Sequence, residues 1–160
     1  MYRDKTLIPS EAIRLCMLGT LALRPHTYAE LARDVRGFTS RIAGPSLDMM
    51  GSSIEVLIAE GLVAPLGELP DPADETLELT AAGTEELRVL LVSNVRSPVD
   101  GVSQLVFALK LRFLHLLSAE DAHDQITRMR EISETERARL LDLKKRYGTE
   151  PGQFDAWLDL

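Results

Sequence analysis

The chain has 160 residues, of which 45% are hydrophobic, 27% charged and 5% aromatic, and its formal net charge at pH 7 is −7. These figures fit one soluble globular domain, or two small lobes that share a core, and they exclude fibres, disordered tails and disulfide-stapled miniproteins. The single cysteine, Cys16, excludes an intramolecular disulfide. No uncharged stretch exceeds nine residues, whereas about 20 apolar residues are needed to cross a bilayer. We therefore expect a cytoplasmic protein without membrane or targeting segments.

Charge is distributed unevenly along the chain. Residues 1–45 hold seven basic and four acidic side chains, residues 46–87 hold ten acidic and no basic ones, and residues 88–160 hold eleven of each. The acidic excess argues against general affinity for nucleic acid, although a local basic patch is compatible with it. Residues 46–87 are called the acidic block below.

The N-terminal part of the chain predicts two helices. Pro9-Ser10-Glu11 opens an amphipathic run with helical spacing that continues to Leu23. Thr27 and Glu30 have the spacing of a capping box, which begins a second helix, and Gly37 is expected to end it.

A third helix and a hairpin are predicted next. Ser46 is the expected N-cap and Gly61 the residue after the C-cap, so this helix ends at Glu60. Its expected buried side consists of Leu47, Met50, Ile54, Leu57 and Ile58. Short β-like runs at 62–66 and 76–79 flank a turn rich in proline, aspartate and glycine. Three helices followed by a hairpin predict a winged helix-turn-helix.

The rest of the chain predicts three more helices. Thr80 caps a helix that runs to about Arg96, and Ser97-Pro98 breaks it and starts the next one. Ser118 caps a helix that meets no glycine or proline before Gly148. A helix of roughly 29 residues is about 44 Å long and outruns a domain of this size. After it, Phe154, Trp157 and Leu158 are spaced for one apolar turn.

The predicted fold class is mainly α, in the α+β sense of a winged helix. We expect a winged-helix domain at residues 1–96 and a helical dimerisation lobe at residues 97–160. The over-long helix and the excess of apolar positions between residues 99 and 117 favour a homodimer. The candidate dimerisation residues are Val102, Leu109, Phe113, Ile126, Met129, Leu140 and Leu143.

Four segments of the chain carry a family resemblance. Residues 18–32 hold a Leu-Gly helix end, an Arg-Pro turn and Tyr28; residues 57–63 read Leu-Ile-Ala-Glu-Gly-Leu-Val. Residues 79–87 contain Leu-Thr, Gly and Leu, and the apolar run 107–118 precedes the long charged helix. In order and spacing these segments resemble the PadR family of bacterial transcriptional regulators. The resemblance implies a DNA-binding winged helix, a C-terminal dimerisation lobe and a small aromatic effector.

Two features depart from the family pattern. Helix three has Gly51, Ser52 and Glu55 where the family has a tyrosine, a proline and basic residues. The wing carries Asp71, Asp74, Glu75 and Glu78 in place of arginines. A surface that binds DNA neutralises phosphates with lysine and arginine, so this charge opposes the usual contact.

Two hypotheses about function follow from the charges. In the first, the protein is a transcriptional regulator that binds DNA directly through residues outside the acidic block or through short polar donors: Arg33, Arg36, Arg41, Ser46, Ser52 and Ser53, with Arg3, Lys5 and Arg14 as additions. In the second, it does not bind DNA and regulates by presenting an acidic surface to a basic protein: Glu55, Asp71, Asp74 and Glu75.

Catalytic, metal and cofactor sites find little support in the sequence. Glu120 and His123 have the E-x-x-H spacing of di-iron bundles, but the pair occurs once, and acids in a first helical turn complement the helix dipole. No two histidines have the spacing of a ligand pair. The chain contains no phosphate loop, nucleophile elbow or dinucleotide fingerprint. We expect no enzyme, no metal and no cofactor.

Overall fold

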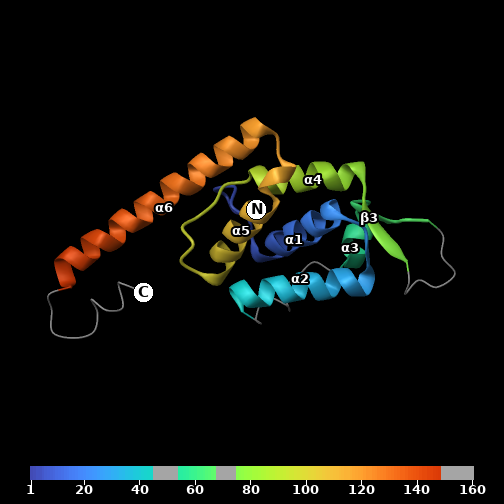
Figure 1. Ribbon diagram of the computed structural model, residues 1–160, viewed down its shortest axis with the longest axis horizontal. Coiled ribbons are helices and arrows are strands. Elements are labelled where there is room, and N and C mark those ends of the chain that lie inside the picture. Colours follow the sequence, from blue (N-terminus) through green and yellow to red (C-terminus); the bar gives the residue numbers. More distant parts are fainter. Residues whose placement is uncertain (45–53, 68–74, 149–160) are drawn as a thin grey trace.

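A computed structural model of the chain describes residues 1–44, 54–67 and 75–148. The described part is mostly helical with a small antiparallel sheet (Figure 1), which confirms the predicted α+β winged-helix class. The helices are α1 (Pro9–Leu23), α2 (Tyr28–Ala43), α3 (Ile54–Ala59), α4 (Ala81–Val92), α5 (Gly101–Phe113), the 3-10 turn η2 (Leu114–Leu116) and α6 (Ala119–Tyr147). The strands are β1 (His26–Thr27), β2 (Val63–Pro65) and β3 (Thr76–Leu79).

The first helix has the predicted bounds, and the second is longer than predicted. The capping box at the start of α2 is present, with the backbone N–H of Glu30 donating to the hydroxyl of Thr27. Gly37 does not end α2, which continues to Ala43. The buried face of this helix extends past the glycine to Thr39, with Phe38 and Ile42 packed against the core. Burial of that face outweighs the cost of a helical glycine, which is about 0.5–1 kcal/mol.

Helix α3 ends at the predicted glycine before the chain enters the sheet. Gly61 has a φ of +71°. The backbone N–H of Leu62 donates to the carbonyl of Leu57, and that of Gly61 to Ile58, both at 2.9 Å. This is a Schellman motif, and it confirms the predicted helix end. Leu57 is fully buried, but Ile58 is 37% exposed, so its assignment to the buried side was wrong. The predicted N-cap Ser46 lies outside the described residues, as do Leu47 and Met50.

The sheet contains one strand that the sequence did not predict. Its order is β1-β3-β2, and both pairings are antiparallel. The hairpin strands β2 and β3 match the predicted runs. The two residues of β1 are too few to show the alternation that marks a strand in a sequence.

The segment between α4 and α5 differs from the prediction. Helix α4 ends at Val92 instead of near Arg96, and α5 begins at Gly101 with Asp100 as its N-cap instead of at Pro98. Helix α6 begins after Ser118, whose hydroxyl accepts from the N–H of Asp121, and it runs to Tyr147 as predicted.

A buried lysine accounts for the early end of α4. Lys110 of α5 is 1% exposed, and its ammonium donates to the carbonyls of Leu91 at 2.5 Å and Ser93 at 2.6 Å. It also donates to the side-chain oxygen of Gln125 on α6 at 3.1 Å, while the amide of Gln125 donates to the carbonyl of Val92. Side chains of α5 and α6 therefore supply the partners that the last carbonyls of α4 lack. Burial lowers the pKa of Lys110 to about 7, and the charge of Arg128 acts in the same direction.

One core joins the predicted domain and lobe. Leu105, Leu109 and Phe113 of α5 are fully buried and belong to the same cluster as the core residues of α1 and α2. A Cβ on Gly19 of α1 would clash with the ring of Phe113. The predicted boundary at residues 96 and 97 thus falls in a connecting segment, while the core continues across it. Helix α6 leaves this body and projects to one side (Figure 1).

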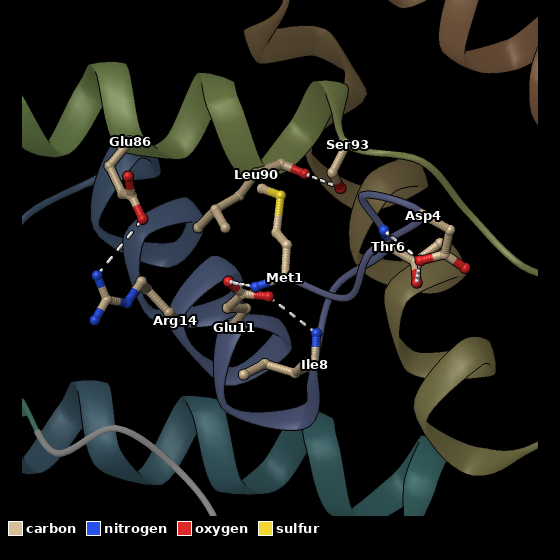
Figure 2. A network of polar contacts seen from close by, with 9 residues as sticks. All are labelled: Met1, Asp4, Thr6, Ile8, Glu11, Arg14, Glu86, Leu90 and Ser93. Carbon is tan, nitrogen blue, oxygen red and sulfur yellow. Dashed lines mark hydrogen bonds and ion pairs between the residues drawn. The ribbon is translucent and has the colours of Figure 1, made fainter.

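Polar contacts fix the N-terminal segment to α1 and to the residues that follow α4. The carboxylate of Glu11 accepts from the terminal amine and from the N–H of Ile8, and Asp4 accepts from the hydroxyl of Thr6 (Figure 2). The pKa of Asp4 is lowered to about 2 by hydrogen bonds from Thr6 and Arg96. These contacts fix the residues before α1 in place.

Candidate nucleic-acid interface

The three candidate arginines lie on one helix. Arg33, Arg36 and Arg41 are all exposed residues of α2. Arg41 had been expected in a loop, but the longer α2 places it in the last helical turn, where it donates to the carbonyl of Gly37 at 3.1 Å. At about 100° per residue, the three arginines fall in one arc on the side of the helix opposite Leu31 and Val35. They form the arginine face of α2.

The arginine face also carries acidic neighbours. The guanidinium of Arg33 lies 3.9 Å from the carboxylate of Asp34, whose other oxygen is 3.4 Å from Nε2 of His26. The side chain of Arg33 is 71% exposed, so an ion pair at this distance leaves most of the guanidinium in solvent. The arrangement therefore presents positive charge from a rigid element, as contact with a phosphate backbone requires.

Arg14 belongs to α1 and not to the arginine face of α2. Its guanidinium is 2.7 Å from Glu60 and 3.5 Å from Glu86 (the latter pair is shown in Figure 2), and its side chain is 19% exposed. Arg14 thus connects α1 with the end of α3 and with α4. Both acidic neighbours compete for the charge that a phosphate needs, so Arg14 has less charge to offer a phosphate than the exposed arginines of α2.

Several candidate residues lie outside the described part of the chain: Ser46, Ser52, Ser53, Asp71 and Asp74. Of the acidic candidates, Glu55 and Glu75 are described. Glu55 is exposed on α3 and accepts a hydrogen bond from the hydroxyl of Tyr28 at 2.7 Å. This bond raises the pKa of Tyr28 and joins the first turn of α2 to the helix expected to read DNA. Glu75 is half-buried immediately before β3.

The acidic side chains in the described part of the acidic block are partly neutralised by arginines that lie outside the block. It contains Glu55, Glu60, Glu75, Glu78, Glu85 and Glu86 and no basic residue. Arg14 pairs with Glu60 and Glu86, and Arg88 pairs with Glu85 at 3.0 Å. Glu55, Glu75 and Glu78 therefore dominate the charge of α3 and the sheet.

The candidate dimerisation residues fall into two groups. Leu109, Phe113 and Met129 are at most 4% exposed and pack inside their own chain. Ile126 is 41% exposed on α6, and Val102, Leu140 and Leu143 are half-buried. Only the second group has surface to offer a second copy in this conformation.

Within the described residues, no group of three or more histidine, cysteine or acidic side chains is arranged to hold a metal ion. Cys16 is buried, and burial raises the pKa of its thiol to about 12, so it has no thiolate character at neutral pH. None of the described helices is long and apolar enough to cross a membrane.

The chain resembles a known protein family over almost its whole length. The family model described as "Putative AphA-like transcriptional regulator" matches residues 2–160. The chain belongs to this AphA-like family. The AphA-like match supports a role in the regulation of transcription, which agrees with the coarser part of the sequence-based prediction. Among curated proteins, none matches the chain.

Two polar contacts of this AphA-like chain were not predicted. The bond between Tyr28 and Glu55 joins residues 27 positions apart, and periodicity carries no signal for it. The contact between Lys110 and Gln125 was also missed. The sequence does hold one signal for it, because a lysine among Leu105, Leu109 and Phe113 is a charged residue at a core position.

Proposed function

We propose that this AphA-like protein is a homodimeric winged-helix regulator that acts in the cytoplasm, pairs through α6 and meets DNA through the arginine face of α2. The resemblance of its sequence to PadR regulators supports the same proposal. The observation that carries it is the extension of α2 to Ala43, because this places Arg33, Arg36 and Arg41 together on a rigid, exposed surface.

The shape and surface of α6 support a dimer. Of its 29 residues only Gln125 and Met129 are buried. Beyond the body, Leu141 is 51% exposed and Tyr147 is 43% exposed. A cavity of about 460 Å³ lies between Pro98 and the part of α6 that contains Leu140 and Leu141. A helix this long with an uncovered apolar side is stabilised by a partner helix.

Charge and spacing favour an antiparallel pair. The first turn of α6 contains Glu120 and Asp121, and its last turn contains Lys144, Lys145 and Arg146. An antiparallel pair sets the acidic end of each helix beside the basic end of the other, whereas a parallel pair sets ends of the same charge side by side. If the pair is centred between residues 134 and 135, Ile126 faces Leu143 and Ser133 faces Glu136.

Sedimentation tests the dimer. Leu140→Lys combined with Leu143→Lys places two charges in the pairing surface, and we expect the subunits to separate. Leu66→Lys is the control, because Leu66 is 47% exposed and lies at the end of β2, away from α6. A wild-type protein that sediments as a monomer at micromolar concentration refutes the homodimer.

The acidic block supports a second candidate function. Glu55 and Glu75, with Asp71 and Asp74 in the sequence between β2 and β3, oppose a phosphate backbone and suit a basic protein surface. In this alternative the chain regulates transcription without reading DNA, by binding a basic protein partner.

Neutralising these acids separates the two candidates. Asp71→Asn, Asp74→Asn and Glu75→Gln together should strengthen binding to mixed-sequence DNA if α2 contacts the duplex, because repulsion beside the contact falls. If the acidic block binds a basic protein, the same variant should leave DNA binding absent and slow association with a polylysine probe. Glu131→Gln with Glu134→Gln, exposed on α6, serves as the matched control.

A further inference from the structure

An apolar groove lies between the end of α1, β3, α4 and η2. Its volume is about 540 Å³, and its apolar walls include Leu23, Leu79, Leu87 and Leu116. The charged residues that line it are Arg24, Glu78, Glu85 and Arg88. Leu23 is 48% exposed and Leu116 is 36% exposed. Single exposed leucines are common on protein surfaces, but neighbouring ones in a hollow mark a binding site.

The groove adjoins the start of α6. Leu116 belongs to the turn that leads into this helix, and the guanidinium of Arg88 is 3.9 Å from Asp121 in the first turn of α6. A polypeptide segment that reaches the first turn of α6 therefore also reaches the edge of the groove.

Residues 149–160 have the composition of an occupant. Phe154, Trp157 and Leu158 follow the i, i+3, i+4 spacing of one helical face. Aromatic side chains bury about 150–250 Å² each, so two of them in one hollow are strong anchors. The segment also has three acidic residues and no basic one, but the groove is lined by two arginines and two glutamates, so the aromatic residues and not the charges favour this occupant.

The segment cannot reach the groove of its own chain. Gly148 is 27 residues beyond Asp121, which along a helix is about 40 Å. The nine residues from Gly148 to Trp157 span at most about 32 Å when fully extended. Since α6 projects away from the body (Figure 1), the aromatic residues fall short of the groove.

We propose that residues 149–160 of a second copy occupy this groove. The inference rests on the dimer proposed above, because an antiparallel pair of α6 helices brings Tyr147 of one copy beside Ala122 of the other. From there the spacer 149–153 leads Phe154 and Trp157 onto Leu23 and Leu116. Residues 149–160 of each copy thus bind the winged-helix body of its partner. Dimerisation thereby adds contacts to the end of α1 and to α4.

Fluorescence tests the proposal, because Trp157 is the only tryptophan. In the wild-type dimer we expect blue-shifted emission and protection from iodide. Leu23→Asp with Leu116→Asp should move the emission to that of a free peptide of residues 149–160 and remove the protection, while sedimentation still gives a dimer. The control Leu66→Asp, at an equally exposed leucine outside the groove, should change neither.

Mixing shows whether the contact is between copies. The groove variant, which keeps Trp157, is mixed with a Trp157→Phe variant that keeps the groove. We expect the blue-shifted emission to return, because mixed dimers give each tryptophan an intact groove on the other copy. A dimer whose emission equals that of the free peptide, or does not respond to the groove variant, overturns this inference and leaves the dimer standing. A monomer overturns both.

Discussion

Replacing Lys110 by methionine should destabilise the protein by about 3 kcal/mol at pH 7. Methionine fills a similar volume but donates no hydrogen bond, so the carbonyls of Leu91 and Ser93 and the side-chain oxygen of Gln125 each lose a donor. A buried acceptor without a partner costs about 1–3 kcal/mol, and the low end of that range for three acceptors gives the estimate. For a chain of this length the melting temperature should fall by about 6–12 °C.

The pH dependence of stability gives a second readout for Lys110. Its pKa is about 7 in the folded protein and 10.5 in the unfolded chain, so between these values the unfolded state binds more protons. Stability should therefore rise with pH across this window, by up to about 1.4 kcal/mol per pH unit. This pH-dependent part is complete above pH 10.5 and is lost as pH falls to about 7, so the loss expected at pH 7 comes from the hydrogen bonds alone.

Urea denaturation at pH 7, 8 and 9 measures both effects. In Lys110→Met the free energy of unfolding should rise less steeply with pH, because the contribution of Lys110 is missing. The difference in free energy of unfolding between the wild type and the variant should therefore increase with pH. Lys5→Met, at an exposed lysine before α1, should match the wild type at all three pH values. A Lys110→Met protein with wild-type stability and an unchanged pH profile would show that the amine does not hold α4, α5 and α6 together.

Further substitutions test individual elements of the fold. Gly37→Ala should stabilise the protein by about 0.5–1 kcal/mol, because Gly37 is inside α2 and a Cβ there meets only Arg41 at 3.6 Å; a loss of thermal stability would contradict the extended helix. Leu57→Ala should cost about 2–5 kcal/mol, measured by urea denaturation, because Leu57 is fully buried. Val56→Ala, at a residue that is 40% exposed, should change stability little. Equal losses of stability in the two variants would show that the buried face of α3 has been assigned wrongly. Gly83→Ala should lower the melting temperature, because its Cβ would clash with the backbone carbonyl of Leu62.

Local signals in the sequence predicted most of the elements. Capping residues fixed the starts of α2, α4 and α6 at Thr27, Thr80 and Ser118, because each supplies an oxygen for an N–H that the helix leaves unpaired. Gly61 after α3 was equally informative, because the positive φ that ends this helix is one that glycine adopts without strain. Gly37 gave the wrong helix end, because its backbone stays helical. The burial of side chains before and after it determines how far α2 continues.

The elements that sequence missed depend on contacts between distant residues. The early end of α4 follows from Lys110 and Gln125, which come 18 and 33 positions after Val92. The interior position of Phe113 follows from Gly19, which leaves room for its ring. For the candidate interface, the residue types were readable in the sequence, but the common face of Arg33, Arg36 and Arg41 required the true length of α2.

The salt dependence of DNA binding tests contact through α2 most directly. Binding of mixed-sequence duplex DNA is titrated between about 50 and 200 mM salt, and the slope of log K against log salt gives the number of phosphates neutralised. We expect weak binding with a steep slope in the wild type. In the triple variant Arg33→Gln, Arg36→Gln, Arg41→Gln the slope should shrink by about 0.9 for each phosphate that is no longer neutralised, or about 2.7 per bound protomer.

The matched control replaces two exposed cations of α6, Arg130→Gln with Lys145→Gln, and should keep the wild-type slope. A slope that falls only in the α2 variant is the result we predict. A slope that the α2 variant leaves unchanged, or a wild type that shows no binding at the lowest salt, would contradict DNA contact through the arginine face.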